Sequence, residues 1–229
     1  MIRNGSVLNV YQAVMFDLDG TLIDSKINFP RMKAKSIQFL ERSGVKPGLL
    51  TKNMLNQEIE HRAKMFLRKE EFSTDTVRTI FREVTSIMNA VELEAIERIQ
   101  LYYDVPETLQ TIQRFGLKIG ILTRGCREYA EKAVKKVRLQ RCIDAIVARD
   151  DVSNPKPDPE HPRQLLKILK VKPSETLLVG DTITDIRCAH NVRMKSAWLN
   201  REGTRLPIKT PKPDYKIHSL IEVLDIIKR

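Results

Sequence analysis

Asp17 and Asp19 stand two residues apart, directly after the apolar run Ala13 to Phe16. If that run forms a β-strand and its extended geometry continues, both side chains leave the same side of the chain. Two carboxylates held close together repel each other, so such a pair shares a proton or binds a cation. Because the neighbouring residues offer no imidazole or thiolate, the oxygen ligands favour magnesium. Aspartate pairs are also common in turns and helix caps, so the pair alone leaves a structural role open.

Polar clusters also follow two other apolar runs of the chain. Lys118 to Thr123 continues into the letters RG, and Thr176 to Gly180 continues into DTITD. With Ala145 to Arg149, Ser196 to Asn200 and the helical stretches between them, these runs predict an α/β fold, a Rossmann-like doubly wound parallel sheet covered by helices. An open sheet of this kind binds ligands beyond the carboxyl ends of its strands. We therefore expect segments distant in the sequence to meet at one edge of the sheet.

Two of the helices can be recognised from their ends. One is predicted to open at Pro106, to carry an apolar stripe from Leu109 to Phe115, and to end at Gly116. Another is predicted to end at Asn191, because asparagine can adopt the left-handed conformation of a helix C-cap.

About a hundred residues separate the first two strands, more than a simple crossover requires. We expect a small helical cap domain at residues 25–97, inserted into a core of residues 1–24 and 98–229. Apolar residues in two segments of this insertion repeat at helical spacing, which predicts buried helix faces. They are Leu55, Ile59, Ala63 and Phe66 in the first segment, and Val77, Ile80, Phe81, Val84, Ile87, Met88 and Val91 in the second.

The charges of the insertion are divided unevenly along the chain. Ser25 to Lys69 holds eleven Lys or Arg against three Glu, whereas Glu70 to Glu97 holds two Arg against seven acids. Basic and acidic helices could lie side by side and neutralise each other. Alternatively, the basic half could attract an anionic substrate. The sequence leaves both interpretations open.

The letters D-L-D-G-T at Asp17 to Thr21, followed by Leu22 and Ile23, resemble the signature of the haloacid dehalogenase superfamily. Three further motifs of that family have counterparts at later strand ends, in the family's order. Each has a structural alternative, as a helix cap or a solvated loop charge, but such roles would not place all of them at strand ends facing one site. The counterparts are Thr123 in KIGILT, Lys156 in NPKPDP, and Asp181 and Asp185 in GDTITD.

The resemblance implies phosphatase chemistry. Asp17 would be the nucleophile that forms an aspartyl-phosphate, and Asp19 would protonate the leaving alcohol and then deprotonate water. True haloacid dehalogenases lack the second aspartate, so its presence favours phosphate chemistry. Thr123 and Lys156 would bind the phosphoryl group. Arg124 stands where a small polar residue is expected, and both a phosphate contact and an outward orientation remain open for it.

The resemblance also implies a magnesium ion as the cofactor. Asp17 and Asp181 would bind Mg²⁺ through their side chains, and Asp19 through its backbone carbonyl. Asp185 would orient bound water or Lys156.

The position of the insertion resembles the helical-cap subgroup that includes phosphoglycolate phosphatase and β-phosphoglucomutase. A closing cap suits a small phosphorylated metabolite, phosphoglycolate-like or a sugar phosphate, as substrate. Three alternatives stay open. They are a phosphomutase of the β-phosphoglucomutase type, a nucleic-acid end phosphatase or binding module, and an inactive core that binds a partner.

Composition narrows the setting of this activity. The 229 residues carry a formal net charge of +11, but the Lys and Arg are scattered with few interleaved aromatics, so we do not expect nucleic acid as a partner. No apolar run approaches the roughly 20 residues that span a bilayer, so we expect no membrane partner. The three cysteines are widely spaced, which favours reduced thiols, and the four histidines show no metal-ligand spacing. We expect a cytoplasmic monomer or homodimer.

Overall fold

The computed structural model describes residues 10–201, 203–207 and 211–228. The chain divides into two compact units, which we call the core unit, residues 1–25 and 98–229, and the helical unit, residues 26–97. The insertion expected at residues 25–97 differs from this division by one residue at its first boundary.

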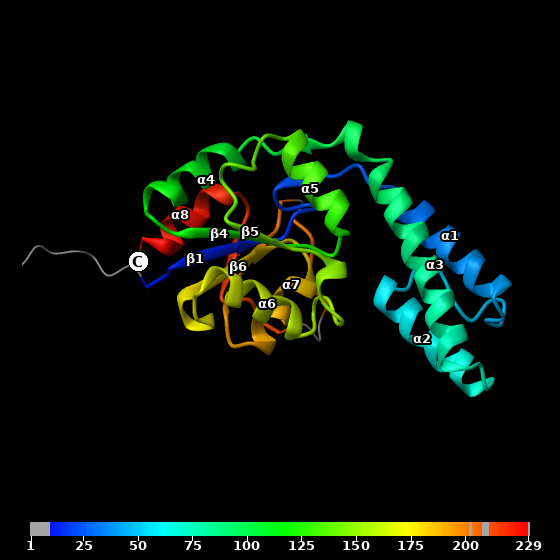
Figure 1. The fold of residues 1–229 in the computed structure, drawn as a ribbon. Coiled ribbons are helices and arrows are strands. Elements are labelled where there is room, and N and C mark those ends of the chain that lie inside the picture. Colours follow the sequence, from blue (N-terminus) through cyan, green and yellow to red (C-terminus); the bar gives the residue numbers. More distant parts are fainter. Residues whose placement is uncertain (1–9, 202, 208–210, 229) are drawn as a thin grey trace, which may run out of the picture. The chain divides into compact units, whose positions relative to one another are not determined.

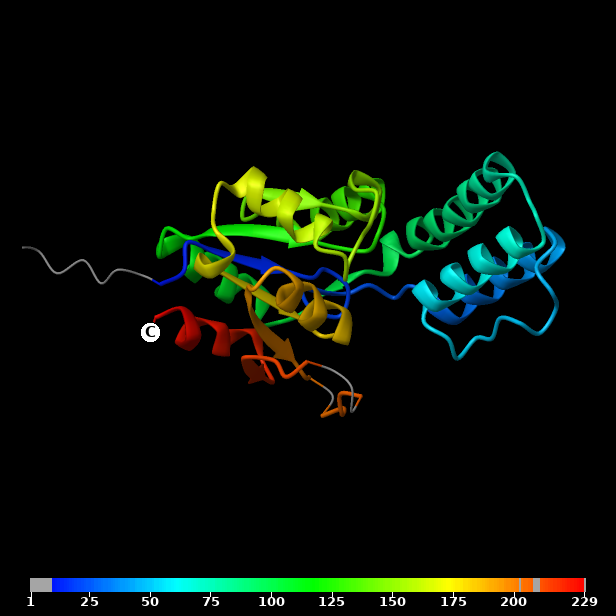
Figure 2. The same cartoon turned by 90° about the horizontal axis from the view of Figure 1, so that it is seen from below.

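The core unit is built on a parallel sheet whose strand order is β5-β4-β1-β6-β7-β8. Both neighbours of the central strand β1 run parallel to it, with Ala13 opposite Lys118 in β4 and Thr176 in β6. Figure 2 shows the arrows of these strands pointing the same way. The strands are β1 (Ala13–Phe16), β4 (Lys118–Leu122), β5 (Ala145–Val147), β6 (Thr176–Gly180), β7 (Lys195–Leu199) and β8 (Tyr215–Ile217).

Helices cover both faces of this sheet, as Figure 1 shows. On one face lie α4 (Val105–Arg114), α5 (Arg127–Lys136) and α8 (Val223–Ile227). On the other lie α6 (Glu160–Leu169) and α7 (Ile183–Asn191), where a buried apolar cluster joins strand residues such as Met15 and Leu178 to Leu165. The prediction of a doubly wound parallel α/β fold is therefore confirmed.

The two chain segments that connect the units run side by side in the core unit. Strand β2 (Ile23–Asp24) pairs antiparallel with β3 (Gln100–Leu101), so that Ile23 lies opposite Leu101 and Asp24 opposite Gln100. We call this pair the connecting ribbon.

Arg201 holds the chain on both sides of the connecting ribbon. Its guanidinium donates two hydrogen bonds of 2.9 Å to Asp104, just after β3, and one of 3.2 Å to the carbonyl of Thr21, just before β2. Asp104 is 1% exposed and also accepts hydrogen bonds of 2.8 Å from the Ser219 hydroxyl and the Leu220 amide. Burial favours the neutral acid, but these donors lower the pKa of Asp104, so the carboxylate stays charged.

The helical unit consists of α1 (Phe29–Arg42), α2 (Asn56–Lys69) and α3 (Thr74–Leu93). Ser73 caps α3, since its hydroxyl accepts the amide hydrogen of Thr76. An ion pair between Arg31 and Glu94 links the basic and acidic halves of the insertion. A buried apolar cluster in the helical unit includes Leu40, Ile59, Ala63, Leu67, Ile80 and Phe81.

Several local predictions were wrong. Phe115 and Leu55 were expected on buried helix faces, but they are 37% and 53% exposed. Helix α4 ends at Arg114 and α2 begins at Asn56, so both residues lie outside these helices. Asn191 is the last residue of α7, but the left-handed conformation after this helix belongs to Arg193, with φ 58°. Strand β8 and the connecting ribbon were not predicted.

Two further features bear on the composition. None of the helices in the described ranges is long and apolar enough to cross a bilayer. In the part of the chain that the structure describes, Cys126, Cys142 and Cys188 form no disulfide.

Candidate active site

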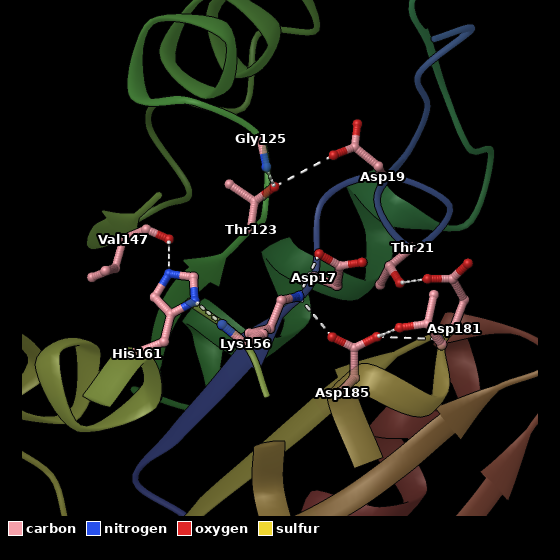
Figure 3. Close-up of polar contacts among 11 residues, drawn as sticks. Asp17, Asp19, Thr21, Thr123, Gly125, Val147, Lys156, His161, Asp181 and Asp185 are labelled. Atoms are coloured by element: carbon pink, nitrogen blue, oxygen red, sulfur yellow. Dashed lines mark hydrogen bonds and ion pairs between the residues drawn. The ribbon is translucent and has the colours of Figure 1, made fainter. Parts of the chain in front are cut away.

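Four of the predicted site residues lie at or just past the carboxyl ends of neighbouring strands. Asp17 follows β1, and its amide still donates to the Val179 carbonyl of β6 at 2.9 Å. Thr123 follows β4, and its amide donates to the Val147 carbonyl of β5 at 3.1 Å. Asp181 follows β6, and Asp185 lies in the first turn of α7. The sheet thus brings these segments to one edge (Figure 3).

Lys156 joins two of these acids from a loop between β5 and α6. Its ammonium nitrogen lies 2.8 Å from Asp17 Oδ1 and 2.7 Å from Asp185 Oδ1, and the residue is only 2% exposed. Burial alone would lower the pKa of Lys156, but the two carboxylates raise it above its ordinary value. The side chain therefore carries a fixed positive charge beside Asp17.

His161 holds the Lys156 loop in place. Its ring is completely buried, its Nδ1 accepts the amide hydrogen of Lys156 at 2.9 Å, and its Nε2 lies 3.1 Å from the Val147 carbonyl. Since Nδ1 accepts, Nε2 carries the proton and donates it. Burial and the Lys156 charge lower the pKa of His161 to about 4, so the ring stays neutral.

Asp185 is fixed by bonds to both of its oxygens. Oδ2 accepts hydrogen bonds from the Thr182 amide at 3.1 Å and the Thr182 hydroxyl at 2.6 Å, which caps α7, while Oδ1 accepts from Lys156. Gly180 makes room for this arrangement, because a Cβ there would lie 2.3 Å from Asp185 Cγ.

Asp17, Asp181 and Asp185 form a carboxylate cluster in which one oxygen of each lies within 4.8 Å of the others. Burial and the neighbouring acids raise the pKa of Asp17 well above its ordinary value, although Lys156 opposes the shift. Burial and Asp185 raise the pKa of Asp181 to about 7. Three acids facing a single ammonium leave negative charge uncompensated, and their oxygens are hard ligands, so the cluster fits a divalent cation such as Mg²⁺.

Gly20 and Thr21 set the position of the Asp181 carboxylate. Gly20 has φ +85°, and a Cβ at this position would lie 2.4 Å from Asp181 Oδ2. The Thr21 hydroxyl donates to Asp181 Oδ1 at 3.3 Å. Glycine in the D-L-D-G-T segment is therefore required by both its backbone conformation and the neighbouring carboxylate.

Asp19 is half-buried, and its side chain is not part of the carboxylate cluster. Its Oδ1 accepts a hydrogen bond of 2.5 Å from the Tyr129 hydroxyl. Its Oδ2 lies 3.4 Å from the Thr123 hydroxyl, and Figure 3 marks this second contact. The two aspartates that are neighbours in the sequence thus have separate surroundings, one near an ammonium and acids, the other near hydroxyl donors.

Arg124 is half-buried between Thr123 and Gly125. Its carbonyl accepts a hydrogen bond of 2.7 Å from Arg149, and its charge contributes to lowering the pKa of His161.

Tyr129, His161 and Thr182 belong to the site but were not identified from the sequence as site residues. Thr182 carried a visible signal, since a threonine three residues before Asp185 is typical of a capping box. His161 lies five residues after Lys156 and at the start of a helix, which is a weak signal. Nothing in the sequence indicates that Tyr129 contacts Asp19.

The model of the haloacid dehalogenase-like hydrolase family matches residues 14–199 of the chain. The pyrophosphatase PpaX of Bacillus mycoides (strain KBAB4) is 35% identical over 136 residues, which make up 58% of this chain and 62% of that protein. A HAD phosphatase structure from Thermococcus onnurineus is 26% identical, with a TM-score of 0.61, and the match covers 94% of this chain and 97% of that one. A predicted phosphoglycolate phosphatase from Haemophilus somnus 129PT has a TM-score of 0.65 at 20% identity, covering 96% and 99% of the two chains, which is a likeness of fold.

Proposed function

Because the chain belongs to the haloacid dehalogenase-like hydrolase family, we propose that it is a magnesium-dependent phosphatase that forms an aspartyl-phosphate. The proposed substrate is a small phosphorylated metabolite. The observation that carries the proposal is the buried carboxylate of Asp17, 7% exposed, beside the fixed positive charge of Lys156.

Asp17 is the proposed nucleophile. One of its carboxylate oxygens bonds to phosphorus while the bond between phosphorus and the leaving oxygen breaks. Water then attacks the phosphorus of the aspartyl-phosphate, and orthophosphate leaves with Asp17 restored. Lys156 supports this role, because its charge opposes protonation of Asp17 and would offset the charge of the phosphoryl group.

Asp19 is the proposed general acid and base. It protonates the leaving oxygen in the first step and takes a proton from the attacking water in the second. Two observations support this role. The Asp19 side chain lies outside the carboxylate cluster, and it contacts the hydroxyl groups of Tyr129 and Thr123.

We propose Asp17 and Asp181 as side-chain ligands of Mg²⁺ and the backbone carbonyl of Asp19 as a third ligand. When bound, the ion would neutralise phosphate charge and make the phosphorus easier to attack. Asp185 is proposed to orient Lys156 rather than to bind the ion, because hydrogen bonds already occupy both of its oxygens.

Thr123, Lys156 and Arg124 are the proposed phosphate-binding residues. The Thr123 hydroxyl lies 3.4 Å from Asp19 Oδ2, which supports a contact with a phosphate bound between Asp17 and Asp19. Arg124 is proposed as a phosphate-binding residue because it is next to Thr123 in the chain.

Two substrate classes have support from different relatives. The likeness to a predicted phosphoglycolate phosphatase supports a small phosphate ester, such as phosphoglycolate or a sugar phosphate. The 35% identity to PpaX, named a pyrophosphatase, supports inorganic pyrophosphate as the second candidate.

The test is phosphate release from phosphoglycolate, sugar phosphates, pyrophosphate, an aryl phosphate and a 5′-phosphorylated oligonucleotide, each with and without Mg²⁺. We expect Mg²⁺-dependent release from small substrates and a loss of about 1000-fold or more in Asp17→Asn. Asp225→Asn is the matched control, since Asp225 is exposed on α8. An Asp17→Asn variant as active as the parent would refute the nucleophile, and release from the oligonucleotide alone would favour the nucleic-acid alternative.

A further inference from the structure

Tyr129 makes the short contact to the proposed general acid. It lies on α5, its side chain is completely buried, and its hydroxyl is 2.5 Å from Asp19 Oδ1. The other Asp19 oxygen lies at the longer distance of 3.4 Å from the Thr123 hydroxyl. The two oxygens of Asp19 are therefore not equivalent.

The backbone before α5 fixes where the Tyr129 hydroxyl lies. Gly125 packs directly on the ring, and a Cβ at residue 125 would lie 2.7 Å from Tyr129 Cδ1. The Gly125 amide donates to the Thr123 hydroxyl at 2.9 Å, which ties this turn to the end of β4. Because the ring is enclosed and a tyrosine hydroxyl lies in the plane of its ring, Asp19 meets a donor whose position is set by the fold.

We propose that Tyr129 is a positioning residue for Asp19, an inference that rests on the proposed function. The Tyr129 hydroxyl donates to Oδ1 and holds the carboxyl group in one orientation. Because Tyr129 engages Oδ1, the oxygen that exchanges a proton with the substrate is Oδ2, on the side of Thr123.

The position of the Asp19 proton matters in the first step of the reaction, when the leaving oxygen must be protonated. As Asp17 bonds to phosphorus, the bond from phosphorus to the leaving oxygen breaks, and the proton on Asp19 Oδ2 passes to that oxygen. An alkyl alcohol leaves poorly without this proton, whereas a nitrophenolate leaves readily as an anion. Loss of the Tyr129 hydroxyl should therefore affect alkyl phosphates much more than nitrophenyl phosphates.

The test compares kcat/KM of Tyr129→Phe on an alkyl phosphate and on p-nitrophenyl phosphate, because kcat/KM reports steps up to the release of the leaving group. We expect a loss of about 10- to 100-fold on the alkyl phosphate and less than about threefold on the nitrophenyl ester. Tyr103→Phe is the matched control, since Tyr103 is 85% exposed in the core unit, and it should leave both values unchanged.

The ratio of the two losses separates positioning from a structural role. A partly unfolded variant loses the same factor on both substrates, so equal losses would overturn the inference, as would no loss on either. Added to Asp19→Asn, Tyr129→Phe should change kcat/KM on the nitrophenyl ester by less than about twofold, since no carboxyl remains to be positioned. A further tenfold loss there would also overturn it.

Failure of the proposed function gives a different result from failure of this inference. If the parent protein releases no phosphate, or if Asp17→Asn is as active as the parent, the phosphatase assignment fails. If the parent is active and Asp17→Asn is not, only the leaving-group comparison decides the role of Tyr129.

Discussion

Replacing Lys156 by methionine should destabilise the metal-free protein strongly. Methionine keeps most of the buried volume but removes the cation between Asp17 and Asp185, whose nearest oxygens lie 2.8 and 2.7 Å from the ammonium nitrogen. The side chains of Asp17 and Asp185 are only 10% and 2% exposed, so water compensates their charges poorly. Removing one partner of a buried ion pair in this way costs about 3–5 kcal/mol of unfolding free energy.

The loss in Lys156→Met should depend on pH and on metal. Burial and the neighbouring acids already raise the pKa of Asp17, and without Lys156 it should rise further. A carboxyl whose folded pKa is raised destabilises the fold as pH rises above its unfolded pKa, so the loss should be largest near pH 8 and smaller near pH 5. Saturating Mg²⁺ should restore part of it, because the ion supplies the missing positive charge.

Urea unfolding with EDTA at pH 8 measures this difference. Lys195→Met is the matched control, because Lys195 pairs with Asp214 at 2.6 Å but its side chain is 56% exposed, so the cost should stay below about 1 kcal/mol. If Lys156→Met unfolds at the same urea concentration as the parent at pH 8, with the same slope, the electrostatic account of the site is wrong.

Two further predictions concern the fold around the site. The folded pKa of His161, about 4, lies below its ordinary 6.5, so the contribution of His161 to stability is complete above pH 6.5 and is lost as pH falls towards 4. The difference in unfolding free energy between the parent and His161→Asn should therefore narrow by about 3 kcal/mol between pH 7 and pH 4. A difference that stays constant with pH would contradict the assignment of a neutral ring. Arg201→Met leaves the buried Asp104 carboxylate with the neutral donors Ser219 and Leu220. It should lower the free energy of unfolding by about 3 kcal/mol, measured in urea at pH 7. An unchanged urea midpoint would show that Asp104 does not need the Arg201 charge.

The sheet could be predicted where single strands carry enough apolar residues. The structure places β1 at Ala13–Phe16 and β6 at Thr176–Gly180, as the sequence predicts, because each is a continuous buried run bounded by polar residues. Strand β8 has only three residues, and the connecting ribbon has two in each strand. Such short segments become strands through their pairing partners, which local periodicity does not reveal.

The site could be predicted as far as its residues follow strands. The edge of a parallel sheet brings Asp17, Thr123 and Asp181 together, and this does not depend on the conformation of the loops between them. The contacts of Tyr129 and His161 depend instead on how α5 and the Lys156 loop pack in three dimensions. That packing involves residues far apart in the sequence, so no spacing rule indicates it.

The connecting ribbon brings the two ends of the inserted helical segment next to each other in the core unit. Because Asp24 lies directly opposite Gln100, the whole segment between them leaves and re-enters the core at adjacent points. A two-residue hairpin turn could bridge those points without disturbing a strand of the main sheet. Segments of other lengths and shapes can therefore be grafted at this junction while the carboxylates of Asp17 and Asp181 keep their places.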